Sequence, residues 1–219
     1  MRYVPPGSLA NGPGRARLRC TPISFLPFLI LLAIFFAGCH RISPVDTKPL
    51  DTAGITYDAI QQLKILQITA SEVGEVARAR QSGFSDANCV EILKIFRDKN
   101  QAFEAGDAVA DLVQAQVGED TILELARLNQ LGLSAGEFQA MRLAGLSDAI
   151  VLEVARHQAA NNPVLSGASL AGLKNMGVRE TTLLELARRG VPDSQANAII
   201  SSRRHGASDA EILGHFTGS

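Results

Sequence analysis

The chain has 219 residues, of which 20% are charged and 5% aromatic, with no tryptophan and a formal net charge of −1. Nucleic-acid-binding domains usually gather a basic excess on one face, so this balance does not favour that class. The low aromatic content also disfavours a carbohydrate groove, because such grooves depend on aromatic platforms.

The N-terminal region has the charge order of an export signal. An apolar run from Ile23 to Phe36 follows Arg15, Arg17 and Arg19, and basic residues before an apolar run are typical of a secretory signal peptide. The run is interrupted by Pro27 and falls short of the roughly 20 apolar residues that a spanning helix needs. We therefore expect cleavage; the alternatives are an uncleaved anchor and ordinary secretion.

The run ends in Phe36-Ala37-Gly38-Cys39, which resembles the lipobox of bacterial lipoproteins. The resemblance implies a signal peptide over 1–38 and acylation of Cys39, which tethers the mature chain to a membrane of the cell envelope. His40 follows the cysteine. Because this residue is not Asp, the resemblance implies sorting to the outer membrane, facing the periplasm.

The mature chain is mildly acidic. Residues 1–38 contain four arginines and no acid, so 21 − 4 = 17 basic and 22 acidic side chains remain, a net charge of −5. Pro44 and Pro49 among polar residues predict a flexible tether over 39–56. Cys89 has no disulfide partner once Cys20 is removed and Cys39 is acylated, and we expect a buried thiol there.

After the tether the chain repeats itself over 57–219. An acidic residue marks each copy, at spacings of 33, 29, 32 and 29 residues: Asp86, Glu119, Asp148, Glu180 and Asp209. Units of about thirty residues are typical of helical-hairpin arrays. We expect an all-α fold of about ten helices in five hairpins, arranged as a short solenoid or a compact bundle.

Helix caps explain why the pattern recurs. Glycine takes the left-handed conformation that ends a helix, and a following serine can cap the next helix, with an acid favoured by the helix dipole in its first turn. Capping-box spacing predicts further helix starts. These signals are Gly83, Gly145, Gly177 and Gly206; Ser85, Ser147 and Ser208; and the pairs Thr69 with Glu72, Ser134 with Glu137, and Ser208 with Glu211.

Charged pairs three residues apart are predicted to stabilise the second helix of a hairpin from its solvent side. They are Glu124 with Arg127, Glu153 with Arg156, and Glu185 with Arg188. The stretch from Leu133 to Leu152 resembles short helix-turn-helix modules that recur in bacterial envelope proteins. That resemblance implies a fold and carries no active site.

Three patterns resemble chemistry. Gly83-Phe84-Ser85 begins like a nucleophile elbow, but the second glycine and the preceding strand are missing. The histidines lack metal-ligand spacing, so no metal is predicted. The stretch from Leu170 to Leu184 resembles a DNA-binding helix-hairpin-helix with a single hairpin glycine, near a basic group formed by Arg188, Arg189, Arg203 and Arg204.

The sequence therefore predicts a lipid-anchored envelope protein that binds a protein partner without catalysis and without a cofactor. First helices vary between units, so the predicted partner face is Gln139, Arg142, Lys174 and Asn175, all taken as surface positions. The alternatives are an envelope enzyme with dispersed carboxylates and DNA binding of the helix-hairpin-helix kind, although the net charge has the wrong sign for phosphate contacts.

Overall fold

The computed structural model describes residues 45–132 and 134–216. Over these ranges the chain forms twelve α-helices and one short 3-10 helix, and it contains no strand. The predicted all-α class is confirmed. The predicted signal peptide and Cys39 lie outside the described residues.

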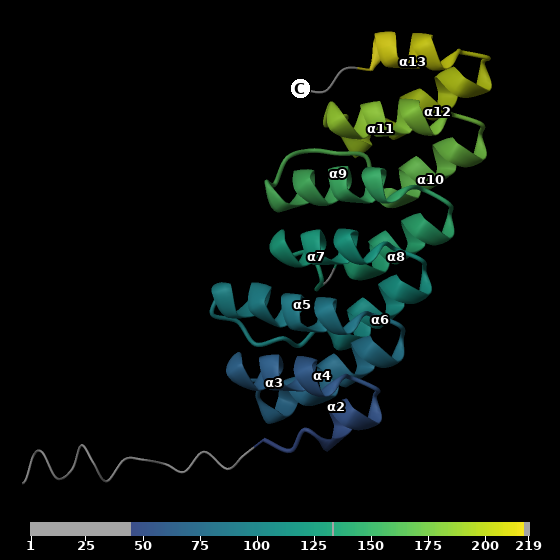
Figure 1. Ribbon diagram of the computed structural model, residues 1–219. Helices are drawn as coiled ribbons and strands as arrows, with labels where there is room; N and C mark the ends of the chain where they lie inside the picture. The colour runs from purple at the N-terminus through teal and green to yellow at the C-terminus, as the bar shows by residue number, and fades with distance from the viewer. Residues whose placement is uncertain (1–44, 133, 217–219) are drawn as a thin grey trace, which may run out of the picture. The chain divides into compact units, whose positions relative to one another are not determined.

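The helices form six hairpins stacked in two layers (Figure 1). The first helix of each hairpin belongs to the first layer: α2 (Lys48–Thr52), α4 (Ala70–Gln81), α6 (Gly106–Gln114), α8 (Ala135–Leu143), α10 (Gly167–Asn175) and α12 (Ala196–Arg204). The second helix belongs to the second layer: α3 (Tyr57–Ile65), α5 (Asp86–Asp98), α7 (Glu119–Arg127), α9 (Asp148–Ala159), α11 (Glu180–Arg188) and α13 (Asp209–His215). The 3-10 helix η1 (Asp193–Gln195) leads into α12.

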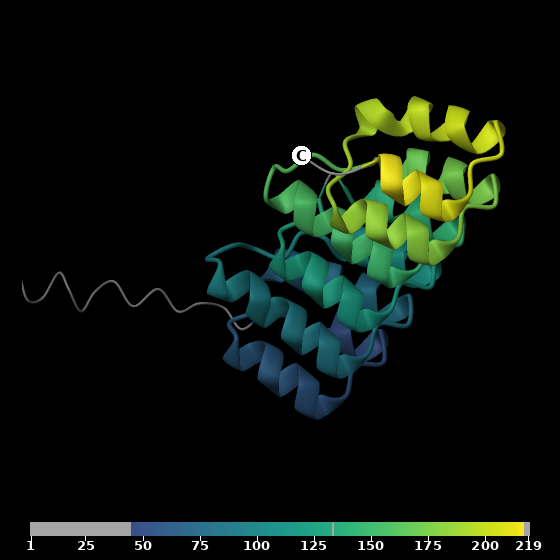
Figure 2. The ribbon, with the colours of Figure 1, turned by 90° about the horizontal axis from the view of Figure 1, so that it is seen from above.

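Packing follows the order of the chain. From α2 to α10, and from α3 to α13, each helix packs on the next member of its own layer as well as on its hairpin partner. Viewed along the stack, the second-layer helices run roughly parallel to one another (Figure 2). Of the two predicted architectures, this arrangement is the short solenoid.

The number of hairpins and the length of the tether differ from the prediction. Residues 45–56 do not form a tether, because α2 lies there, packs on α4 and buries Leu50 and Ile55. Pro49, one of the two prolines that predict the tether, occupies the first turn of α2, where a helix tolerates proline. Within residues 45–132 and 134–216 the array therefore has six hairpins, of which α2–α3 is the first.

All the helices from α2 to α12 end in the same way. The residue after the C-cap has a positive φ, and the following amide bonds to the carbonyl five residues back, as Leu146 does to Met141 at 3.0 Å. This is the Schellman motif. The predicted caps are confirmed, with Gly145 at φ +79°. The sequence did not reveal the non-glycine caps: Gln67, Asn100, Gln116, Asn129 and Asn161.

Most predicted helix starts are confirmed. Thr69 and Ser208 form capping boxes, and the Ser85 hydroxyl accepts from the Asn88 amide. The box between Ser134 and Glu137 does not form, since Ser134 has helical angles and its side chain caps nothing. The Glu137 carboxylate accepts instead from the backbone of Gly167 in the next hairpin, at 2.6 Å.

The predicted charged pairs form in two hairpins of three. Glu124 pairs with Arg127 at 3.4 Å and Glu153 with Arg156 at 3.3 Å. Glu185 pairs with Arg189 at 2.8 Å rather than with Arg188.

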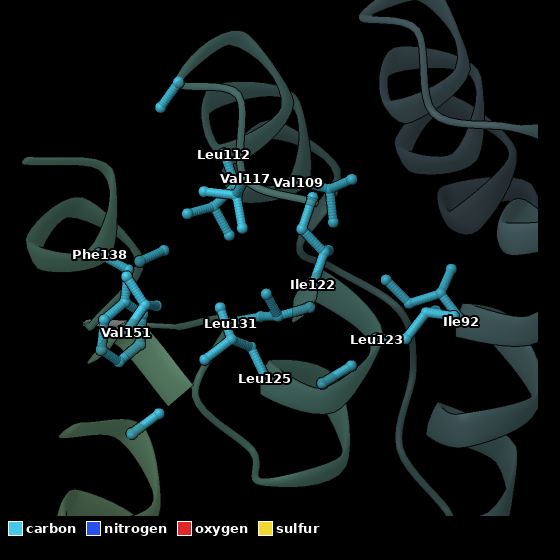
Figure 3. Packing of buried hydrophobic residues seen from close by; sticks show 14 of the residues in the cluster. Ile92, Val109, Leu112, Val117, Ile122, Leu123, Leu125, Leu131, Phe138 and Val151 are labelled. Carbon is cyan, nitrogen blue, oxygen red and sulfur yellow. The ribbon is translucent and has the colours of Figure 1, made fainter. Parts of the chain in front are cut away.

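One hydrophobic core runs through the stack. Figure 3 shows its middle, where Val109 and Leu112 of α6, Leu125 of α7, Leu131 of the α7–α8 connection and Phe138 of α8 belong to one cluster. Each longer connection thus contributes an apolar residue to the core: Phe103, Leu131, Leu165 and Val191. Cys89 is fully buried, as predicted, and burial raises the pKa of its thiol to about 12.

Candidate functional site

The recurring acids join neighbouring hairpins. The Asp148 carboxylate, at the start of α9, accepts from the backbone amide of Gly118 at 2.8 Å and from the Thr121 hydroxyl at 3.1 Å. Three other acids accept the N-cap amide of the preceding second-layer helix in the same way. They are Asp86 from Thr56 at 2.9 Å, Glu119 from Ser85 at 3.2 Å, and Asp209 from Arg179 at 3.0 Å.

We call Asp86, Glu119, Asp148 and Asp209 the inter-repeat carboxylates. The sequence placed them in the first turn of a helix, but it did not reveal that each bonds an amide about thirty residues earlier. The spacing of the acids equals the repeat length, and this agreement is the signal that could have revealed the bonds between hairpins. Glu180 departs from the pattern, since it lies 3.8 Å from the Lys174 ammonium instead.

Basic residues three positions before the turn glycine complete these junctions. Arg142 donates to the carbonyl of Leu146 at 2.6 Å and to that of Gln116 in the preceding hairpin at 2.8 Å. Its Nε lies 3.0 Å from Asp148. Lys174 donates to the Gly145 carbonyl of the preceding hairpin.

Two of the four residues predicted to bind a partner therefore support the fold. Arg142 and Lys174 lie on the adjacent helices α8 and α10, half-buried in these junctions; Gln139 is half-buried and Asn175 is exposed. Their role in binding stays a prediction. The assumption that Arg142 and Lys174 are free surface positions is wrong, because their side chains bond carbonyls of the turns.

The deepest charge is Glu72 of α4, whose side chain is fully buried. Its carboxylate accepts from Arg97 at 2.5 Å and 2.7 Å, from the Phe103 amide at 2.9 Å and from the Thr69 amide at 2.8 Å. Burial raises the pKa of this carboxyl, but the Arg97 side chain and the two backbone amides outweigh burial and lower the pKa to about 2. A carboxylate with all these partners is stable in its charged form and holds the α5–α6 connection against α4.

An open pocket of about 420 Å³ lies beside that connection. Phe96, Ala105 and Leu131 form its apolar wall, while Gln101, Glu104 and Asn129 place polar groups in its lining. Lys99 caps the C-terminal end of α7 nearby, because its ammonium donates to the carbonyls of Ala126 at 2.6 Å and Arg127 at 2.8 Å. Sequence reasoning missed this pocket, because most of its residues come from two connections that follow no repeated pattern.

Several residues of the other chemistry-like patterns have structural partners. The Ser85 hydroxyl donates to Glu119 at 2.5 Å and caps α5. In the basic group, Arg203 donates to the carbonyls of Gly177 at 2.7 Å and Ala207 at 2.9 Å, and Arg189 donates to that of Leu213 at 2.7 Å.

Within the described ranges, no cluster of three or more His, Cys, Asp or Glu residues could hold a metal ion. None of the helices in those ranges is long and apolar enough to cross a membrane. Comparison with protein-family models, with curated proteins and with solved structures found no match.

Proposed function

We propose that this protein is a lipid-anchored adaptor of the bacterial cell envelope, a helical-hairpin solenoid that binds a protein partner and does not catalyse a reaction. The observation that carries the proposal is that charged side chains serve to join neighbouring hairpins. Charged side chains bond backbone groups of neighbouring hairpins throughout the stack. They are the inter-repeat carboxylates, Arg142, Lys174 and the Glu72–Arg97 pair. These residues build an extended scaffold of the kind that repeat proteins use for binding.

The pocket between 99–105 and 128–132 is the binding place that we assign to the partner. Phe96 and Leu131 suit one apolar side chain, and the exposed Glu104 carboxylate suits a cationic group beside it. The occupant we propose is an extended protein segment with an apolar residue next to a lysine or arginine. Such a segment fits an acidic surface, since the mature chain has a net charge of −5 (17 − 22).

The experiment is photo-crosslinking in living cells, with a photoreactive amino acid at Gly132. This glycine is exposed beside the pocket, and a side chain added there meets nothing within 4 Å. We expect one protein to crosslink from this position and not from the exposed Ala168 on α10, which serves as the matched control. Crosslinking that is equal at both positions, or absent at Gly132, would contradict the assignment of the pocket.

A purified protein that turned over an envelope substrate would contradict the adaptor proposal itself. Competition with synthetic peptides tests the chemistry of the occupant. A peptide with adjacent leucine and lysine should suppress the Gly132 crosslink, whereas the same peptide with glutamate in place of lysine should not.

A further inference from the structure

One end of the stack exposes a face on which the described residues place no helix. It lies on α3, the second-layer helix of the first hairpin, at the lower end of the stack in Figure 1. Tyr57 and Ile65 there are 75% and 79% exposed, and Leu143 of α8 is the other large apolar residue that is strongly exposed in the described ranges.

The residues of α3 differ from those of the inner hairpins at the positions that face the preceding hairpin. The first residue of α5, α7, α9, α11 and α13 is acidic, and four of these five acids bond backward to the preceding hairpin; the first residue of α3 is Tyr57. The eighth residue is buried and apolar in the inner helices, but it is the exposed Lys64 in α3. The inner residues at that position are Leu93, Ala126, Ala155 and Ala187.

These differences exclude another repeat as the occupant of the face. A hairpin stacked on α3 would bury the Lys64 ammonium, and it would find no carboxylate at Tyr57 to accept its N-cap amide. Burying an unpaired charge is unfavourable. The same argument excludes head-to-tail stacking of a second copy of the chain.

The α3 face combines apolar and polar side chains. With about 100° of rotation per residue, Lys64, Tyr57, Gln61 and Ile65 follow one another in that angular order on one side of α3. An aromatic residue with a polar tip, a long cationic side chain and a branched apolar residue are the combination that suits a lipid–water interface.

The position of the predicted anchor favours lipid over water as the environment of the α3 face. Eight residues lie between Cys39 and Lys48, the first residue of α2, and the nine Cα–Cα steps that join the two residues span at most about 32 Å in any conformation. If Cys39 is acylated, the start of α2 is held within this distance of the bilayer, and no other hairpin in the described ranges is joined to Cys39 by a shorter segment of chain.

We propose that the α3 face formed by Tyr57, Gln61, Lys64 and Ile65 rests on the lipid headgroups, so that the solenoid stands with its first hairpin on the membrane and its later hairpins away from it. This inference rests on the lipid anchor in the proposed function. It adds an orientation, in which the partner-binding pocket is held above the membrane rather than against it.

The test uses the absence of tryptophan from the chain. Tyr57→Trp and, as the matched control, Leu143→Trp each introduce a single fluorophore at an exposed apolar position, on α3 and on α8. The full acylated chains are incorporated into vesicles of phosphatidylethanolamine and phosphatidylglycerol. Quenching by aqueous acrylamide and by brominated phospholipid is then measured, alongside sedimentation of the vesicles.

The proposal expects the fluorescence of the Tyr57→Trp protein to be shielded severalfold from acrylamide and quenched by brominated lipid, while the Leu143→Trp protein shows neither effect. Equal acrylamide quenching in both proteins, with both sedimenting with the vesicles, would overturn the lipid-facing orientation and leave the anchor intact. Failure of both proteins to sediment would overturn the anchor and the orientation together. Shielding of the Tyr57→Trp reporter in a Cys39→Ser protein without vesicles would assign the face to a second copy, and would also overturn the proposal.

Discussion

At the scale of single residues, Glu72 shows how a charge is kept inside this stack. Its carboxylate has no exposed surface, yet two Arg97 nitrogens and two backbone amides bond to it. These partners make the charged form more stable in the folded protein than in the unfolded chain. Glu72 therefore couples folding to pH, because the folded state lowers its pKa to about 2 from 4.5.

The first prediction concerns acid stability. A carboxyl with a lowered folded pKa stabilises the protein fully above its unfolded pKa, and this contribution is lost as the pH falls from about 4.5 toward 2. The linked free energy is of order 3 kcal/mol. Glu72→Gln should be much less stable than the wild type in urea titrations at pH 7, and the gap should narrow as the pH approaches 2. A gap independent of pH would show that Glu72 does not stabilise the fold as a carboxylate.

Glycines give a second prediction at this scale. A Cβ on Gly106 would lie 2.4 Å from the Glu75 carbonyl oxygen, whereas a Cβ on Gly172 of α10 would meet nothing within 4 Å. Gly106→Ala should lower the free energy of unfolding by about 1–3 kcal/mol through overpacking. Gly172→Ala should raise it by up to about 1 kcal/mol through helix propensity. Thermal melts of both variants compare the two effects; destabilisation of similar size in both would contradict the close packing of α4 on α6.

At the scale of helices and their junctions, the inter-repeat carboxylates connect one hairpin to the next. Asp148 accepts from Gly118 and Thr121 and lies beside Arg142. Each junction thus joins the start of one second-layer helix to the start of the next, so that these bonds resist sliding between hairpins.

The third prediction removes one such bond. Asp148→Ala leaves the Gly118 amide and the buried Thr121 hydroxyl without their acceptor, and it removes the carboxylate beside Arg142. The change should cost about 1–3 kcal/mol. Asp120→Ala, at an exposed position in the first turn of α7, should change stability by less than about 0.5 kcal/mol. In native-state hydrogen exchange, the Gly118 amide should lose protection in the first variant only. Unchanged protection in both would mean that the carboxylate does not hold the junction.

The sequence predicted local structure better than contacts between hairpins. Caps such as Thr69 with Glu72 and turn glycines such as Gly145 depend on neighbours within a few residues, so their spacing could be read directly. The failed box at Ser134 has the same spacing, but Glu137 bonds the amide of Gly167, thirty residues away. The α2 helix was missed because Leu50 becomes buried only through contact with another hairpin.

Less of the candidate site than of the fold could be predicted from the sequence. The pocket forms where two non-repeating connections meet, and Phe96 and Leu131 approach each other only through the stacking of hairpins. The predicted partner face on α8 and α10 includes Arg142 and Lys174, whose side chains bond carbonyls of the preceding hairpin. Variability between repeats does not distinguish such a side chain from one on a free surface.

At the scale of the whole molecule, the proposal joins two parts, a lipid at Cys39 and a solenoid that begins a few residues later at Lys48. An adaptor anchored in this way searches for partners in the thin layer above a membrane, where tethering raises the effective concentration of its binding pocket. In the proposed function, the anchor therefore contributes to binding as well as to location.

The fourth prediction tests this coupling. Cys39→Ser should move the protein from the membrane to the soluble fraction, because no helix in the described ranges reaches spanning length. The Gly132 crosslink should weaken in the same cells, while the purified variant should keep its thermal stability. Membrane retention of the variant would point to an uncleaved N-terminal anchor instead.

The most direct test of the central claim is the mass of the N-terminal peptide of the protein recovered from bacterial membranes. The lipid-anchored adaptor predicts a peptide that begins at Cys39 and carries a diacylglyceryl group and an amide-linked acyl chain. A peptide that still contains residues 1–38, or one that begins near Cys39 with an unmodified thiol, would contradict it.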